Sequence, residues 1–281
     1  MQQPVFALPD HPVVTLRGRD AAAFAQAQFM SDVGTLADGN WHWSGWLTPK
    51  GRVVALFALL KASADTVHLV LHDADPEDFA AQLQRFVFRT KVAIETGAWQ
   101  AGGAFEAHAG AVDARAAATS GGFALDFGGD GGARTLWIGP RTESRDDPAA
   151  RGRWAAFDLA HGLPRLAASQ SGQWTPQQLS LERLRAFSVK KGCYPGQEIV
   201  ARTHFLGKAK RGLALFECDA PVEPGEAVEE NGRGLGTIVA TARTAPGHLA
   251  LAVLALDPPA VAPLAGGRQL QPAALRDGLA R

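Results

Sequence analysis

The chain has 281 residues, with 28 Lys and Arg against 28 Asp and Glu, and only two cysteines. A hydrophobic content of 46% with 20% charged residues excludes wholesale disorder and predicts a folded protein of about two domains. Cys193 and Cys218 are too few for a disulfide framework, a structural zinc site or an all-cysteine iron–sulfur cluster built from this chain alone. Because the net charge is zero, contact with nucleic acid would need a local basic patch.

Signals for targeting and membrane insertion are absent from the sequence. The segment from Met1 to Val5 has neither a basic region nor an apolar region of the kind found in signal peptides. The longest apolar run, Val53 to Leu60, is far shorter than the ~18 residues that span a bilayer. We therefore expect a cytoplasmic protein whose two thiols are free.

The first third of the chain predicts an α+β arrangement. The residues Thr48-Pro49-Lys50-Gly51 suit a type I turn between two strands, with proline second and glycine fourth. Asp75 and Pro76 have the residue types of a helix cap and a first helical position. The expected elements are a strand at 13–16, a helix from 21 to about 30 capped by Asp20, a hairpin of 41–47 and 53–60, a strand at 66–72, a helix after Asp75 to about Val87, and a strand at 91–94.

The remaining two thirds contain two helices and then an all-β end. Gly128 to Gly132 lacks the GK[ST] ending of a phosphate loop, and no helix follows it, so we interpret it as a hairpin turn. From Leu213 onward, short alternating runs between Pro and Gly turns predict a small β module. The other expected elements are strands near 123–127 and 135–138, a helix from about 148 to 161, and a second helix after Thr175-Pro176.

The most informative segment runs from Lys190 to His204. It has the pattern of a glycine-flanked loop that leads into a helix starting near Gly196 or Gln197. A thiol just before a helix N-terminus and beside two lysines lies in positive potential that favours the thiolate, so Cys193 is a candidate reactive group. Glycines on both sides would let backbone approach a ligand, and the only tyrosine, Tyr194, offers a face for stacking. The alternative is that Cys193 is a small buried residue in a tight turn.

These residues also carry a resemblance to a known family. Lys191 to Glu198 reads K-G-C-Y-P-G-Q-E, which resembles the K-G-C-[FY]-x-G-Q-E signature of the YgfZ family. That family consists of folate-binding-fold proteins related to the aminomethyltransferase, or T-protein, of the glycine cleavage system. Further similar patches are spread along most of the chain, at 47–53, 162–164, 171–177, 201–204 and 208–211, and the likeness is strongest from 160 to 213.

The resemblance implies a T-protein-like three-domain ring around a central cleft. Two ferredoxin-like α+β domains would interleave in sequence, and a C-terminal β-barrel would follow them. The implied domains are residues 1–40 with 141–205, which carry the K-G-C-Y-P-G-Q-E motif, then 41–140, and then the barrel at 206–281.

The resemblance also implies a function and a set of site residues. Family members assist the assembly or repair of iron–sulfur proteins, including enzymes that modify tRNA, and their usual ligand is tetrahydrofolate. The partners implied are iron–sulfur client proteins or assembly machinery, and folate, with no membrane contact. We expect no stably bound metal, although Cys193 could transiently ligate iron. The residues assigned are Cys193 and Lys191 as reactive groups, and Tyr194, Gly192, Gly196, Gln197, Glu198, Arg202 and His161 as ligand-binding groups.

Two departures from the related enzymes bear on this function. True aminomethyltransferases have an acidic pair after the hairpin glycine, where this chain has Ala55 and Leu56. Neither side chain can accept a proton, so aminomethyl transfer lacks its acid, and enzymatic activity is left open. Folate-binding relatives also have a Glu before the glycine of the central helix. Here the corresponding stretch contains Ala160 and His161, so folate binding should be weakened, with His161 as a weaker replacement. The alternative function is a tetrahydrofolate-dependent aminomethyltransferase or another one-carbon transferase.

A basic cluster follows the motif at Arg202, Lys208, Lys210 and Arg211. It could hold the glutamate tail of a folate or an RNA phosphate, or it could be a solvated face. Direct binding of nucleic acid is not expected. His204 follows Cys193 by three helical turns, which would place the two about 15 Å apart, so a Cys–His pair is not expected either.

Overall fold

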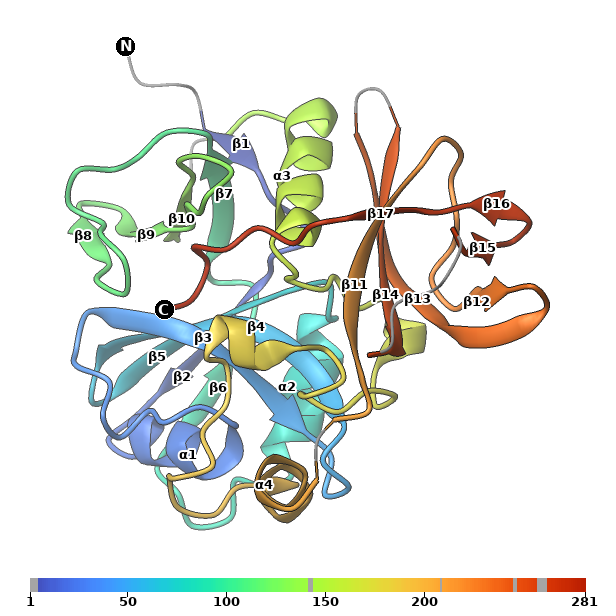
Figure 1. The fold of residues 1–281 in the computed structure, drawn as a ribbon. Helices are drawn as coiled ribbons and strands as arrows, with labels where there is room; N and C mark the ends of the chain where they lie inside the picture. The colour runs from blue at the N-terminus through green and yellow to red at the C-terminus, as the bar shows by residue number, and fades with distance from the viewer. Residues whose placement is uncertain (1–4, 141–143, 208, 245–246, 257–261) are drawn as a thin grey trace.

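The structure is a computed structural model that describes residues 5–140, 144–207, 209–244, 247–256 and 262–281. Three antiparallel sheets are arranged around a common centre, with four α-helices against them (Figure 1). The helices are α1 (Ala21–Gln28), α2 (Pro76–Gln84), α3 (Pro148–Ala160) and α4 (Gln197–Phe205), and the 3₁₀ helices are η1 (Ala168–Gln170) and η2 (Leu181–Leu184).

The first sheet holds the hairpin predicted from the sequence. Trp41 and Trp43 lie in the core that this sheet shares with the second one, whereas Trp46 lies in the core beneath α1 and α2, as the alternation of side chains along a strand requires. The strand order is β3 (Asn40–Leu47), β4 (Val53–Ser63), β5 (Thr66–Leu71), β2 (Val13–Arg17) and β6 (Ala93–Glu95).

The second sheet is built from the glycine-rich middle of the chain. Gly129 and Gly132 close a turn between its two central strands, so the interpretation of this cluster as a hairpin turn is confirmed. The strand order is β1 (Phe6–Ala7), β7 (Gln100–Ala104), β10 (Thr135–Gly139), β9 (Gly122–Asp126) and β8 (Ala117–Thr119).

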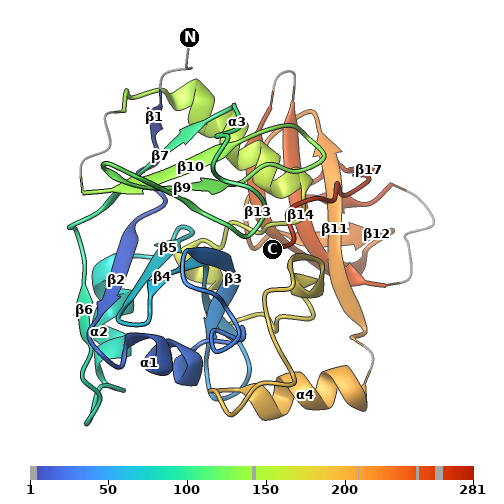
Figure 2. The ribbon, with the colours of Figure 1, turned by 90° about the vertical axis from the view of Figure 1, so that its left-hand side faces the viewer.

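The third sheet is the predicted all-β end, and its seven strands form a nearly closed, barrel-like sheet. Helix α3 packs between it and the second sheet, with Leu159 against Leu215 and Leu251 of the barrel (Figure 2). The strand order is β16 (Arg268–Gln269), β15 (Leu264–Ala265), β12 (Ala227–Glu230), β13 (Arg233–Arg243), β14 (His248–Ala255), β11 (Arg211–Cys218) and β17 (Gln271–Ala273). The expected α+β class with a C-terminal barrel is confirmed.

After β17 the chain returns from the barrel to the centre of the molecule (Figure 1). Leu279 is buried in the core shared by the first two sheets, and its carbonyl accepts a hydrogen bond of 2.6 Å from the indole N–H of Trp43. The guanidinium of Arg281 donates to the carbonyls of Asp126 and Gly128. The C-terminal segment therefore links all three sheets.

Two local predictions were wrong. The helix expected after Thr175-Pro176 is replaced by turns and the short η2, because Ser180 and Arg185 on either side of η2 have left-handed backbone conformations that interrupt a helix. Asp20 precedes α1 as expected, but its carboxylate accepts from the backbone N–H of Lys91 instead of capping the helix. By contrast, Asp75 caps α2 through the N–H of Asp78, as predicted.

The sheets also bear on the domain boundaries. The predicted boundary after residue 40 falls at the start of β3, which lies in the same sheet as β2. The division into 1–40 with 141–205, 41–140 and 206–281 stays a prediction, and limited proteolysis would test it.

Candidate functional site

Lys191 anchors the K-G-C-Y-P-G-Q-E loop to the end of α1. Its ammonium donates to the backbone carbonyls of Gln26, Phe29 and Ser31, at 2.6 Å for Phe29 and 2.9 Å for Ser31. These three bonds use all the N–H donors of a lysine, and the side chain is 7% exposed. Burial lowers the pKa of Lys191 to about 8, because desolvation disfavours the charged amine. The assigned reactive role of Lys191 stays a prediction, since the geometry gives its ammonium a structural task.

Tyr194 and Gln197 stabilise the loop through hydrogen bonds to its own backbone carbonyls. The Tyr194 hydroxyl donates to the carbonyl of Ser188 at 3.0 Å, and the Gln197 amide donates to the carbonyl of Lys191 at 2.9 Å. The ammonium of Lys191 lies 4.9 Å from the centre of the Tyr194 ring, so one ring face already has a cation partner. Burial raises the pKa of Tyr194. Their ligand-binding roles remain predictions.

Gly196 fixes the start of α4 against the hairpin turn of the first sheet. It caps the helix with φ of +79°, and a Cβ there would lie 2.6 Å from the carbonyl oxygen of Thr48. Across the contact, Gly51 has φ of +68°, and a Cβ on it would lie 2.9 Å from the Cβ of Ile199. Two glycines are therefore required for backbone to pack on backbone here.

Cys193 is exposed and makes no disulfide. The alternative of a small residue buried in a tight turn is therefore wrong. The thiol lies four residues before the first residue of α4, with Gly192 and Glu198 also exposed nearby in the chain. Cys218 is buried in the barrel, and burial raises the pKa of its thiol, which fits the expectation that it is inert filling.

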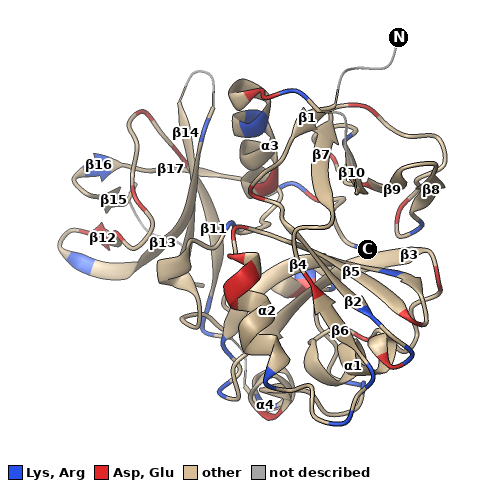
Figure 3. Cartoon of the chain, turned by 180° about the vertical axis from the view of Figure 1, so that it is seen from behind, with Lys and Arg blue, Asp and Glu red and all other residues tan. Residues whose placement is uncertain are grey.

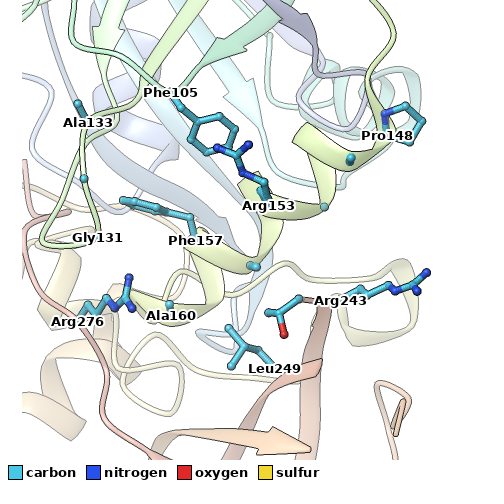
Figure 4. A pocket seen from close by; sticks show the side chains of 15 residues that line it. Phe105, Gly131, Ala133, Pro148, Arg153, Phe157, Ala160, Arg243, Leu249 and Arg276 are labelled. Atoms are coloured by element: carbon cyan, nitrogen blue, oxygen red, sulfur yellow. The ribbon is translucent and has the colours of Figure 1, made fainter. Parts of the chain in front are cut away.

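A separate large pocket lies along α3, between the second sheet and the barrel (Figure 4). Its volume is about 980 Å³, at the upper end of the range for small-molecule sites. Its lining includes three arginines, Arg153, Arg243 and Arg276, and two aromatic rings, Phe105 and Phe157. None of the described residues that line it is Asp or Glu. The guanidinium of Arg153 lies 4.1 Å from the centre of the Phe105 ring. The pocket therefore suits an anion attached to a flat, apolar group.

Ala160 lines this pocket, whereas the next residue, His161, is buried and is not part of the lining. His161 Nε2 accepts from the N–H of Gly131 at 3.2 Å, and Nδ1 lies 2.7 Å from the carbonyl of Phe157. Its ring stacks on Phe157 at 4.1 Å, and burial lowers the pKa of His161. Both ring nitrogens are thus engaged in the neutral form, which leaves His161 without a donor or acceptor for a ligand. Its ligand-binding assignment stays a prediction that this geometry does not favour.

The structure does not bring the predicted residues into one cleft. Lys191, Cys193 and Gln197 do not line the α3 pocket, and α3 and α4 lie at opposite ends of the molecule in both views (Figures 1 and 2). Arg202, on α4, lines another pocket of about 550 Å³ together with Arg52 and Lys210. The α3 pocket arginines were missed because they come from three segments that share no motif.

A buried polar cluster joins the sheets near the centre of the fold. Ligand atoms of His11, His72 and Asp158 all lie within 4.8 Å of one another. However, the Asp158 oxygens pair with Arg134 at 2.9 Å and with Arg165 at 3.2 Å, so two guanidinium charges already neutralise this carboxylate. Added positive charge would be disfavoured there, and we interpret the cluster as structural.

Among the described residues, no helix is long and apolar enough to cross a membrane.

Comparison with solved structures defines the class of fold. The structure superimposes on the glycine cleavage system aminomethyltransferase T from Bartonella henselae with a TM-score of 0.71, covering 95% of this chain and 83% of that one at 12% identity. The protein therefore has the fold of the glycine cleavage T-protein. No family model matches the sequence.

Curated relatives then narrow the class. A tRNA-modifying protein YgfZ from Aliivibrio fischeri is 28% identical over 278 residues, covering 90% of this chain and 85% of the relative. An uncharacterized protein from Haemophilus influenzae is 28% identical over 240 residues, covering 83% and 82%. The YgfZ of Escherichia coli is 41% identical over 108 residues, which cover 36% of this chain and 33% of that protein. Together with the eight-residue motif and the fold, these matches make the chain similar to the proteins of the YgfZ family.

Proposed function

We propose that this protein assists the assembly or repair of iron–sulfur proteins, including tRNA-modifying enzymes, through the exposed thiol of Cys193. The observation that carries the proposal is the contrast between an exposed cysteine and the rigid loop that holds it. Lys191, Tyr194 and Gln197 all bond within the protein, whereas the thiol faces solvent. A loop fixed in this way presents one sulfur to a partner at low cost in conformational entropy.

The position of the thiol suits contact with a metal cluster held by another protein. Cys193 is exposed and lies in the loop that leads into α4. A thiolate at this place could ligate iron transiently, with the remaining ligands supplied by the client, because the ligand of iron is the deprotonated sulfur.

Tetrahydrofolate fits the α3 pocket only in part. Arg153, Arg243 and Arg276 match the carboxylates of the glutamate tail of a folate, and the volume suits a molecule of that size. The pterin ring instead needs acceptors for its N–H donors, and the lining has no carboxylate, because Ala160 stands where folate-binding relatives have Glu. We infer that folate is bound weakly, if this pocket is its site.

The alternative function, folate-dependent one-carbon transfer, has less support. Ala55 and Leu56, which occupy the positions of the acidic pair, are buried apolar residues of β4. No carboxylate in the α3 pocket takes over their task. Turnover of an aminomethyl or methyl donor by the purified protein would reverse this ranking.

The test of the proposed function is complementation in bacteria that lack their own YgfZ. Cells carrying Cys193→Ser should lose most of the activity of iron–sulfur tRNA-modifying enzymes, measured as modified nucleosides by mass spectrometry. Cys218→Ser is the matched control, because its sulfur is buried, and it should restore activity. Full restoration by Cys193→Ser, with normal protein levels, would contradict the proposal.

A further inference from the structure

We propose that the pocket of Arg52, Arg202 and Lys210 binds backbone phosphates of RNA, with one phosphate contact for each of the three cations. The inference rests on the proposed function, in which tRNA is the substrate of the client enzymes. The assignment departs from the expectation that the protein does not bind nucleic acid directly, because the structure adds a cation that the sequence cluster did not contain. Arg52 belongs to the hairpin turn region, some 150 residues from α4 in the sequence.

The packing of two glycines brings these cations together. Gly51 and Gly196 lie in backbone contact, so Arg52, which follows Gly51, is placed beside α4 and its Arg202. Arg52 is held in position by bonds from Nη1 to the carbonyl of Gln173 at 2.8 Å and to the amide oxygen of Gln178 at 3.2 Å. Both bonds use Nη1, which leaves the Nη2 and Nε donors for an anion.

The pocket has no negative charge to balance its cations. Arg52, Arg202 and Lys210 have no ion pair among the described residues, and the lining contains no Asp or Glu. Three like charges within one pocket of about 550 Å³ repel one another, and a bound phosphate would relieve this repulsion. Lys210 lies on the chain between α4 and β11, on the side of the molecule seen in Figure 3.

Exposed apolar side chains beside the pocket indicate RNA in preference to a free anion. Phe205, at the end of α4, is 65% exposed, and Leu206, which lines the pocket, is 85% exposed. An aromatic face next to a cationic groove is how single-stranded RNA is bound, with a base stacked on the ring and the phosphate on the cations. The tail of a folate would use the cations but would have no use for the exposed Phe205 ring.

The experiment measures binding of a fluorescein-labelled, unmodified tRNA transcript to the purified full chain as a function of KCl concentration. For three phosphate contacts, the logarithm of the affinity should fall against the logarithm of the salt concentration with a slope of about −2 to −3. Arg202→Gln and Lys210→Gln should each weaken binding several-fold and make the slope less steep by about 0.7 to 0.9. Phe205→Ala should weaken binding without changing the slope. The matched control is Arg233→Gln, an exposed arginine of the barrel.

The outcomes separate this inference from the proposed function. Cys193→Ser, which should lose activity in cells, should bind the transcript like the unchanged protein, so the two ideas can fail independently. A slope that neither Arg202→Gln nor Lys210→Gln alters would overturn the phosphate site. If those variants weakened binding of a polyglutamylated folate and left the tRNA affinity unchanged, the pocket would be a carboxylate site and the RNA assignment would be wrong.

Discussion

Gly51 and Gly196 touch through their backbones, although 145 residues separate them in the sequence. Because of this contact, the hairpin of the first sheet supports the start of α4, and α4 in turn follows the loop that carries Cys193. Neither residue can be replaced freely, since both have positive φ and both lack room for a Cβ.

The first prediction concerns this contact. Gly196→Ala should destabilise the protein by about 2 kcal/mol or more, since a non-glycine residue in the left-handed region costs about 1–2 kcal/mol before the clash with Thr48 is counted. Urea unfolding followed by tryptophan fluorescence would measure the loss. Gly192→Ala is the control, because a Cβ there would meet nothing within 4 Å, and it should unfold like the unchanged protein. Equal stability of the two variants would show that the contact does not constrain the loop.

The second prediction concerns Lys191. Lys191→Met keeps the apolar stem but leaves the carbonyls of Gln26, Phe29 and Ser31 without a donor. Since each buried unsatisfied acceptor costs about 1–3 kcal/mol and three are left, the loss should be at least about 3 kcal/mol. The loop should also become mobile, so hydrogen exchange at residues 188–197 should accelerate. The neighbouring exposed Lys190 offers a control, and Lys190→Met should change neither property. Normal protection in Lys191→Met would assign the lysine to a role other than anchoring.

The sequence predicted the elements whose signals are local. Thr48-Pro49-Lys50-Gly51 marked the turn between β3 and β4, and Asp75 with Pro76 marked the start of α2. A helix was expected near residue 180 because the leucines there have helical spacing. The structure has none at this point because Ser180 has a left-handed backbone, which depends on tertiary contacts. One such contact is the hydrogen bond from the N–H of Leu213 to the Ser180 hydroxyl.

Of the candidate site, the sequence predicted the motif and its loop but not the contacts that its residues make. The eight residues identify the loop and its exposed Cys193, but not the task of Lys191, whose partners lie in α1 and just after it. The α3 pocket could not be predicted, because Arg153, Arg243 and Arg276 meet only through the packing of the helix between two sheets. His161, at the end of α3, and the motif, which leads into α4, lie apart in the fold.

The third prediction concerns pH. Burial lowers the pKa of His11 and His72 well below 6.5, with Arg165 and Arg134 adding to the effect. Below pH 6.5 the two histidines therefore bind protons in the unfolded chain but stay neutral in the folded one. The free energy of unfolding should fall as the pH drops, by up to about 1.4 kcal/mol per pH unit for each histidine.

The midpoint of urea unfolding at pH 7.5, 6.5 and 5.5 would measure this dependence. His72→Phe should make it less steep by about one proton, and His204→Phe, which changes an exposed ring, should leave it unaltered. An acid-independent midpoint in the unchanged protein would mean that His11 and His72 are protonated in the folded state.

The last prediction restores the missing carboxylate of the α3 pocket. In Ala160→Glu, the new carboxylate would stand in the wall of a pocket that already has three arginines for the glutamate tail and no acid for the pterin. A hydrogen bond to a charged group contributes about 1.5–3 kcal/mol, so tetrahydrofolate should bind at least tenfold more tightly. Trp154 lies directly before Ala155 and Ala156 on the same helix, which makes tryptophan fluorescence a suitable signal for the titration. Ala160→Gln, of nearly equal size, is the control for charge and should improve binding less. If Ala160→Glu bound folate no better than the unchanged protein, the α3 pocket would not be the folate site, and the weak binding inferred for it would need another location.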